Sequence, residues 1–117
     1  MEKISLNLAE RIQLIGFLPK QGSFMVVNLA QELTRELAYS KEEVEKYNIR
    51  LNAQGNGYVW DPNKHTIKIQ ICGMLMDKIK DIVIQFDKEE KLTIDHIGVL
   101  NKIGINLEEL LTNEEVK

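Results

Sequence analysis

The chain has 117 residues, of which 44% are hydrophobic and 28% charged, and its formal net charge is −3. These values are typical of a single soluble globular domain. No apolar run approaches the roughly 18 residues that a membrane span needs, and the start of the chain lacks the basic and apolar regions of a signal peptide. The single cysteine, Cys72, excludes an intrachain disulfide and fits a reducing compartment. We therefore predict a cytoplasmic protein.

The charge is unevenly distributed along the chain. Residues 47–80 hold 5 basic and 2 acidic residues, whereas residues 81–117 hold 4 basic and 9 acidic residues. The basic excess in the middle is small compared with that of nucleic-acid-binding domains. It is therefore weak support for a polyanionic partner, and the acidic end is interpreted as a solvated surface.

Polar and apolar residues alternate over residues 3–6, which predicts a short edge strand at the N-terminus. Asn7 and Glu10 then have the spacing of a capping box, in which each side chain binds the backbone amide of the other residue. We expect a helix over residues 8–18, ended by Pro19. Its apolar side chains lie on two sides, so both sides should be covered.

Two further helices are expected before residue 48, where the spacing of the apolar residues changes. Apolar residues at positions i, i+4, i+7 and i+11 predict a helix over residues 26–38. Ser40 and Glu43 form a second capping-box pattern, which opens a short helix over residues 41–47.

From residue 48 the apolar period is two, which predicts strands. Two-residue loops at Gly55–Asn56 and Pro62–Asn63 would join three antiparallel strands, with Leu51 opposite Trp60. This register collects the apolar side chains of the predicted meander on one face: Ile49, Leu51, Tyr58, Trp60, Ile67 and Ile69.

A helix from residue 74 to about residue 92 is the predicted organising element of the fold. Its core-facing stripe contains Leu75, Ile79, Ile82, Val83 and Phe86. We expect this stripe to pack on the apolar face of the meander. Thr93 should cap a helix over residues 94–103 with Ile97 and Leu100 inward, and a last helix should open near residue 107.

These elements predict an α+β fold with N-terminal helices, a three-stranded antiparallel meander, and C-terminal helices packed on the sheet. Residues 1–112 should form one domain. Residues 113–117 are expected to be a frayed tail, because they have little to bury.

Residue types that carry catalysis or hold metals do not gather in the sequence. His65, His96 and Cys72 lie in three separate predicted elements, which is unlike the ligand spacing of metal sites. The glycines of QGNG lie between strands and not before a helix, so they indicate a turn and not a phosphate-binding loop. We predict no catalytic, cofactor-binding or metal-binding residues, and hence a protein that is not an enzyme.

Apolar residues outside the amphipathic stripes are the candidate contacts for a partner. Ile84 and Met76, with Lys80 beside them, lie on the far side of the organising helix, and Leu14 and Phe17 lie on the first helix. Either a second layer of the domain buries these side chains, or another chain covers them. In the second case the partner is another protein or a second copy in a homodimer.

A winged-helix-like nucleic-acid-binding protein is the alternative. Three helices followed by a hairpin have that order, and Arg50, Lys64 and Lys68 would lie along the outer sheet. The mixed charges on the predicted outer face of helix 26–38 make a poor surface for phosphate. We therefore expect nucleic acid not to be the partner.

The sequence also resembles a group of uncharacterised small phage and prophage proteins. The resemblance lies in ERIQLIGFLPKQGSF, SKEEVEKYNI, YVWD and DKEEKLTIDHIGVLNKI; the group shares an ER…LLP…G.F opening and a DEEKKLT..H ending. It implies a viral or prophage origin and action in the bacterial cytoplasm, and it brings no site residues. Small phage proteins without catalytic residues commonly bind a host or viral protein, including components of host defence. This class predicts a non-enzymatic protein-binding function.

Overall fold

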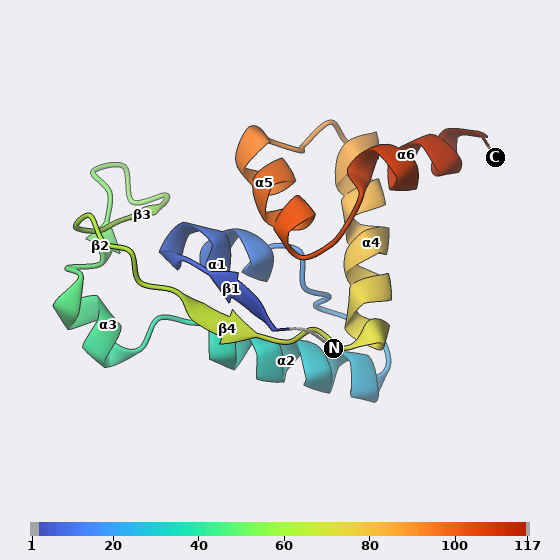
Figure 1. The fold of residues 1–117 in the computed structure, drawn as a ribbon. Coiled ribbons are helices and arrows are strands. Elements are labelled where there is room, and N and C mark those ends of the chain that lie inside the picture. The colour runs from blue at the N-terminus through green and yellow to red at the C-terminus, as the bar shows by residue number, and fades with distance from the viewer. Residues whose placement is uncertain (1–2, 117) are drawn as a thin grey trace.

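A computed structural model describes residues 3–116, with the side chains of residues 3–112. The fold is α+β, as predicted (Figure 1). In chain order the elements are β1 (Ile4–Leu6), α1 (Leu8–Ile15), α2 (Phe24–Leu37), α3 (Lys41–Lys46), β2 (Arg50–Leu51), β3 (Tyr58–Val59), β4 (Ile67–Ile69), α4 (Gly73–Lys88), α5 (Ile94–Lys102) and α6 (Leu107–Val116).

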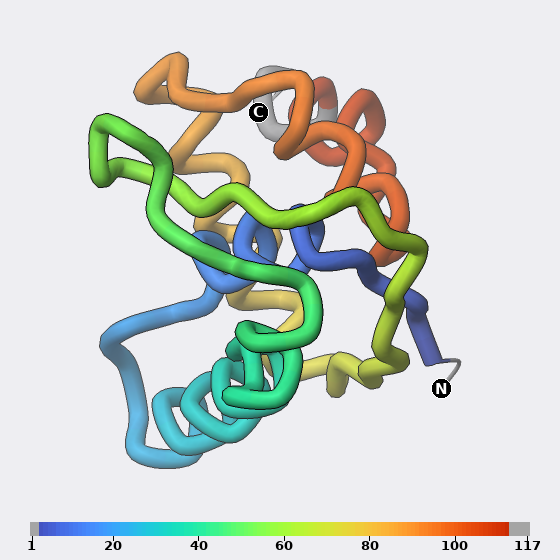
Figure 2. Tube along the Cα trace, turned by 90° about the vertical axis from the view of Figure 1, so that its left-hand side faces the viewer, coloured from blue at the N-terminus to red at the C-terminus, as the bar shows by residue number. Residues whose placement is uncertain are grey.

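The molecule is elongated, with extents of 48 × 29 × 26 Å. Helix α3 and the β2–β3 hairpin form one end, and α4, α5 and α6 form the other (Figure 1). Helix α1 lies between the two ends, and α2 runs below it. The view turned by 90° has the hairpin end facing the viewer and shows β1 running beside β4 (Figure 2).

The predicted meander does not form. Strand β4 pairs antiparallel with β1, with Ser5 opposite Lys68, whereas β2 pairs only with β3. The reason lies in the predicted second turn. The Asn63 side chain donates to the Asp61 carbonyl at 2.9 Å and accepts from the His65 amide at 3.0 Å. These bonds shape a local bend in place of a two-residue hairpin loop, and the chain continues toward β1.

The hairpin at Gly55–Asn56 exists, but its register differs from the predicted one. Leu51 lies opposite Tyr58 and not opposite Trp60. The Asn52 amide donates to the Gly57 carbonyl at 2.8 Å, and the Gly55 amide donates to the Asn52 carbonyl at 3.0 Å, so the loop is longer than two residues. Side-chain bonds between Asn52 and Asn56 favour this longer loop. A shift of two residues keeps the same side chains on the same face.

The hydrophobic core is built mainly by helices. Leu75, Ile79 and Val83 of α4 are buried as predicted, and Phe86 is partly buried against the same core. Helix α4 contacts α2 and α6 rather than the hairpin. The prediction that the α4 stripe covers the sheet is therefore wrong, because the sheet that it was to cover is divided in two.

Local capping signals placed most helix starts correctly. Capping boxes are present at Asn7 and Ser40, and Thr93 caps α5. The end of α1 and the buried face of α5 differ from the predictions. Helix α1 buries Leu8, Arg11 and Leu14 and ends at Ile15. On α5, Val99 is buried beside Leu100, while Ile97 is 42% exposed.

The C-terminal helix α6 extends to Val116, into the segment expected to be a frayed tail. The side chains of residues 113–116 and all of Lys117 lie outside the described residues. Within residues 3–116, no helix is both long enough and apolar enough to cross a membrane.

Candidate functional site

A buried arginine joins three helices near the middle of the molecule. The Arg11 side chain is only 2% exposed. Its Nε donates to the Leu37 carbonyl at 3.0 Å, and its Nη2 donates to the Ala38 carbonyl at 2.7 Å. The same guanidinium makes a bidentate pair with Glu43, at 2.7 and 3.0 Å. Arg11 of α1 therefore fixes both the end of α2 and the start of α3.

Glu43 is the acceptor at the centre of this cluster. Besides Arg11 it binds the Ser40 amide in the capping box and lies 2.7 Å from His65 Nε2. The hydrogen bond from Arg11 is the main cause that lowers the pKa of Glu43 to about 2. The His65 ring in turn stacks on Tyr47 with centroids 5.1 Å apart. The carboxylate thus ties α1, α3 and the segment before β4 together.

Tyr39 extends the cluster toward the hairpin. Its hydroxyl donates to the Leu8 carbonyl at 2.6 Å, and the Arg11 guanidinium lies 5.1 Å from its ring centre. Burial raises the pKa of Tyr39 to about 12. Its ring meets Tyr58 and Trp60 edge-on, at 5.9 and 6.2 Å. The polar cluster therefore positions the aromatic side chains of the hairpin.

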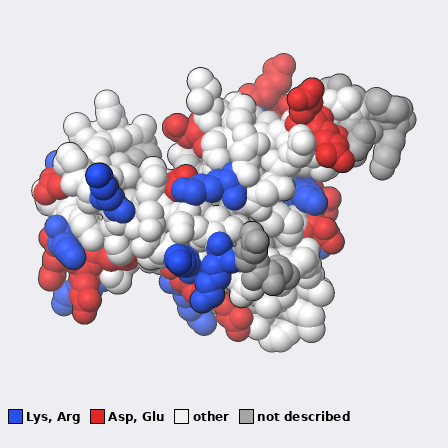
Figure 3. Space-filling view, viewed as in Figure 1, with Lys and Arg blue, Asp and Glu red and all other residues white. Residues whose placement is uncertain are grey.

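A cleft of about 630 Å³ opens between α1, α5 and the hairpin. A smaller cavity of about 340 Å³ lies beside it and shares Ile12 and Tyr58 with it. Figure 3 shows a notch between the α3–hairpin end and the α5 region. The residues lining the cleft are Ala9, Ile12, Gln13, Gly16, Leu51, Gly55, Asn56, Gly57, Tyr58, Trp60 and His96. Those lining the cavity are Ile12, Ile15, Leu37, Ala38, Tyr39, Val44, Ile49 and Tyr58.

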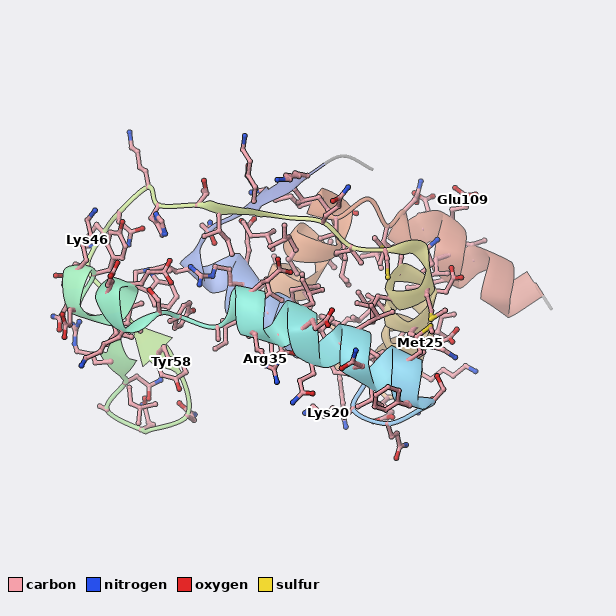
Figure 4. All side chains as sticks on the ribbon, turned by 90° about the horizontal axis from the view of Figure 1, so that it is seen from below. Lys20, Met25, Arg35, Lys46, Tyr58 and Glu109 are labelled. Atoms are coloured by element: carbon pink, nitrogen blue, oxygen red, sulfur yellow. The ribbon has the colours of Figure 1, made fainter. Side chains whose placement is uncertain are left out.

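Large apolar side chains on the cleft walls are open to solvent. Leu51 is 58% exposed, Tyr58 47% and Ile12 36%. Figure 4 shows Tyr58 at the same end of the molecule as Lys46, far from Met25. The shared walls make one continuous surface that is wide enough for several side chains of a ligand. We take this cleft as the candidate site.

The candidate interface residues from the sequence do not form one surface. Leu14 and Phe17 are fully buried, so their assignment to an interface is wrong. Phe17 packs against Phe86 and His96, with centroids 4.8 and 4.9 Å away, because the turn after α1 directs it inward.

The other three candidate interface residues lie on α4. Met76 is partly buried against the core. Lys80 and Ile84 are also partly buried. Contact of Ile84 with a partner stays a prediction.

The basic residues of the alternative do not share an outer sheet. Arg50 lies on β2, donates to the Asn48 carbonyl at 2.8 Å, and has Asp61 at 3.8 Å. Lys68 lies on β4, in the other sheet, and Lys64 lies before that strand. All three side chains are exposed. The division of the sheet separates them, so this part of the winged-helix prediction is wrong.

Among the described residues, no group of three or more His, Cys, Asp or Glu side chains could hold a metal ion. The Nε2 atom of His65 is hydrogen-bonded to Glu43, and the Nδ1 atom of His96 accepts from the Thr93 amide at 3.1 Å. The sequence reasoning missed Arg11. The sequence feature that indicates its burial is its spacing: Arg11 lies three positions from both Leu8 and Leu14, on the face that α1 buries.

Comparison of the chain with protein-family models, curated proteins and solved structures gave no match.

Proposed function

We propose that this is a non-enzymatic binding protein whose cleft between α1 and the β2–β3 hairpin holds a segment of a partner protein. The observation that carries the proposal is the exposure of Leu51, Tyr58 and Ile12 on facing walls of one cleft. Their position costs hydration free energy in the unbound protein, and a partner's apolar side chains would remove that cost.

The chemistry of the lining favours an uncharged, apolar segment. The cleft and its neighbouring cavity are lined by apolar and polar side chains, with no lysine, arginine, aspartate or glutamate among them. The apolar cavity suits one large aliphatic or aromatic side chain. Gln13 and Asn56, in the wider cleft, suit hydrogen bonds to the backbone of a bound peptide. Partners carrying phosphate groups would find no lysine or arginine in these linings.

The biological setting follows from the resemblance to small phage and prophage proteins. In that setting the protein acts in the cytoplasm of the bacterial host. The partner is a host or viral protein, and inhibition of a host defence system is the role that we propose. By holding an apolar segment of the partner in its cleft, the protein would keep that segment from the partner's usual contacts.

The test uses a library of displayed peptides and the single tryptophan of the chain. Trp60 lines the cleft, so its fluorescence reports binding there. We expect selected peptides to be apolar and uncharged, and to shift the emission of Trp60. Leu51→Asp should weaken binding at least about tenfold, by placing a charge in an apolar site.

Val59→Asp is the matched control. Val59 is 38% exposed on the same hairpin but does not line the cleft, so this variant should bind like the wild type. Selection of charged peptides, or equal weakening by both substitutions, would contradict the proposal. Tight, salt-sensitive binding of duplex DNA would instead support the nucleic-acid alternative, through Arg50, Lys64 and Lys68.

A further inference from the structure

Helix α5 exposes an apolar stripe that the cleft does not use. Ile94 is 87% exposed and Ile97 is 42% exposed. With Gly98 and Asn101, which are also exposed, they follow the spacing i, i+3, i+4 and i+7 of one helix face. The opposite face buries Val99 and Leu100. None of the four exposed residues lines the cleft.

Gly98 occupies the middle of this exposed face. Glycine inside a helix is destabilising relative to alanine, because the unfolded chain loses more conformational freedom. A Cβ placed at Gly98 would meet no atom within 4 Å. The described part of the fold therefore gives no steric reason for glycine here. Close approach of a second backbone is one reason for which proteins keep such a residue.

We propose that α5 pairs with α5 of a second copy of this chain, antiparallel and crossing at Gly98. The choice of a second copy rests on charge. At 100° per residue, Asp95 and Lys102 lie about 100° and 80° around the helix from Ile94, on the same flank of the stripe. One charge lies a turn before Gly98 and the other a turn after it.

A two-fold axis perpendicular to α5 makes this flank complementary to itself. The axis brings the same flank of both helices together in opposite directions, so Asp95 lies beside the partner's Lys102, and the reverse. A parallel pair would bring opposite flanks together and lose both contacts. Within one chain, Lys102 also binds Glu10 of α1, at 2.9 and 3.1 Å.

The expected dimer is weak and depends on concentration. The stripe of one nine-residue helix offers less area than the roughly 1,200 Å² buried in stable interfaces. It is also separate from the cleft, so the dimer and the binding of a partner segment can be tested independently.

Mixing two charge variants tests the pairing. Asp95→Lys alone and Lys102→Glu alone should each be monomeric at concentrations where the wild type dimerises, because each homodimer would contain two repulsive pairs. An equimolar mixture should dimerise again, because both pairs then become attractive. Sedimentation velocity from low micromolar to millimolar concentration measures all three samples. A monomeric wild type throughout, or no recovery on mixing, would overturn the proposal.

Gly98→Ala supplies a second test, because it should stabilise the monomer and weaken the dimer. The variant should raise the melting temperature of the dilute monomer, because alanine favours the helix and meets no neighbour. It should weaken dimerisation at least about tenfold, because the methyl group separates the two backbones. Gly73→Ala is the control, since a Cβ there also meets no atom within 4 Å. Unchanged or tighter dimerisation of Gly98→Ala would refute the crossing at this residue.

Discussion

Arg11 and Glu43 lie 32 positions apart in the sequence and form a bidentate ion pair, with the arginine almost fully buried. The pair joins α1 to α3, and through Tyr39 it sets the position of the hairpin that forms one wall of the cleft. The shape of the candidate site thus depends on a contact outside its lining.

Glu43→Gln should destabilise the protein by about 3–5 kcal/mol, because it leaves a buried guanidinium without its counter-charge. Chemical denaturation measures the loss. Glu42→Gln is the control, because Glu42 is an exposed neighbour in the same helix. That variant should change the free energy of unfolding by less than about 0.5 kcal/mol. Equal effects of the two substitutions would show that the ion pair does not stabilise the fold.

The same carboxylate should make stability depend on pH in the acid range. The pKa of Glu43 is about 2 in the folded protein, against 4.5 for a free side chain. A folded-state pKa below the unfolded value gives stability that is complete above pH 4.5 and is lost as pH falls toward 2. Denaturation curves at several pH values should show this loss in the wild type. In Glu43→Gln the slope over this range should be smaller, and an unchanged slope would assign it to other carboxylates.

Replacement by alanine should affect stability strongly at one phenylalanine and hardly at all at another. Phe17 is fully buried, whereas Phe24 is 86% exposed. Phe17→Ala should destabilise the fold by about 3–5 kcal/mol through lost burial and a cavity. Phe24→Ala should have an effect within about 0.5 kcal/mol. Thermal unfolding compares the two, and a tolerated Phe17→Ala would contradict its place in the core.

The helix starts could be predicted because their causes are local. In the capping boxes at Asn7 and Ser40 the bonded groups lie three residues apart, so the sequence pattern contains the whole interaction. The buried side of α4 followed in the same way from its spacing. The sequence alone thus determined the α+β class and the face of the organising helix.

The strand partners and the site were decided only by the tertiary structure. The alternation of Ile67 and Ile69 suits any strand that offers an apolar face, and β1 occupies that place because the bend at Asn63 turns β4 away from the hairpin. The buried position of Arg11 depends on its contacts with Glu43 and with the end of α2. Such contacts join residues far apart in sequence, where spacing carries no information about distance. The sequence determined which residues are apolar, and the packing decided which of them stay exposed around the cleft.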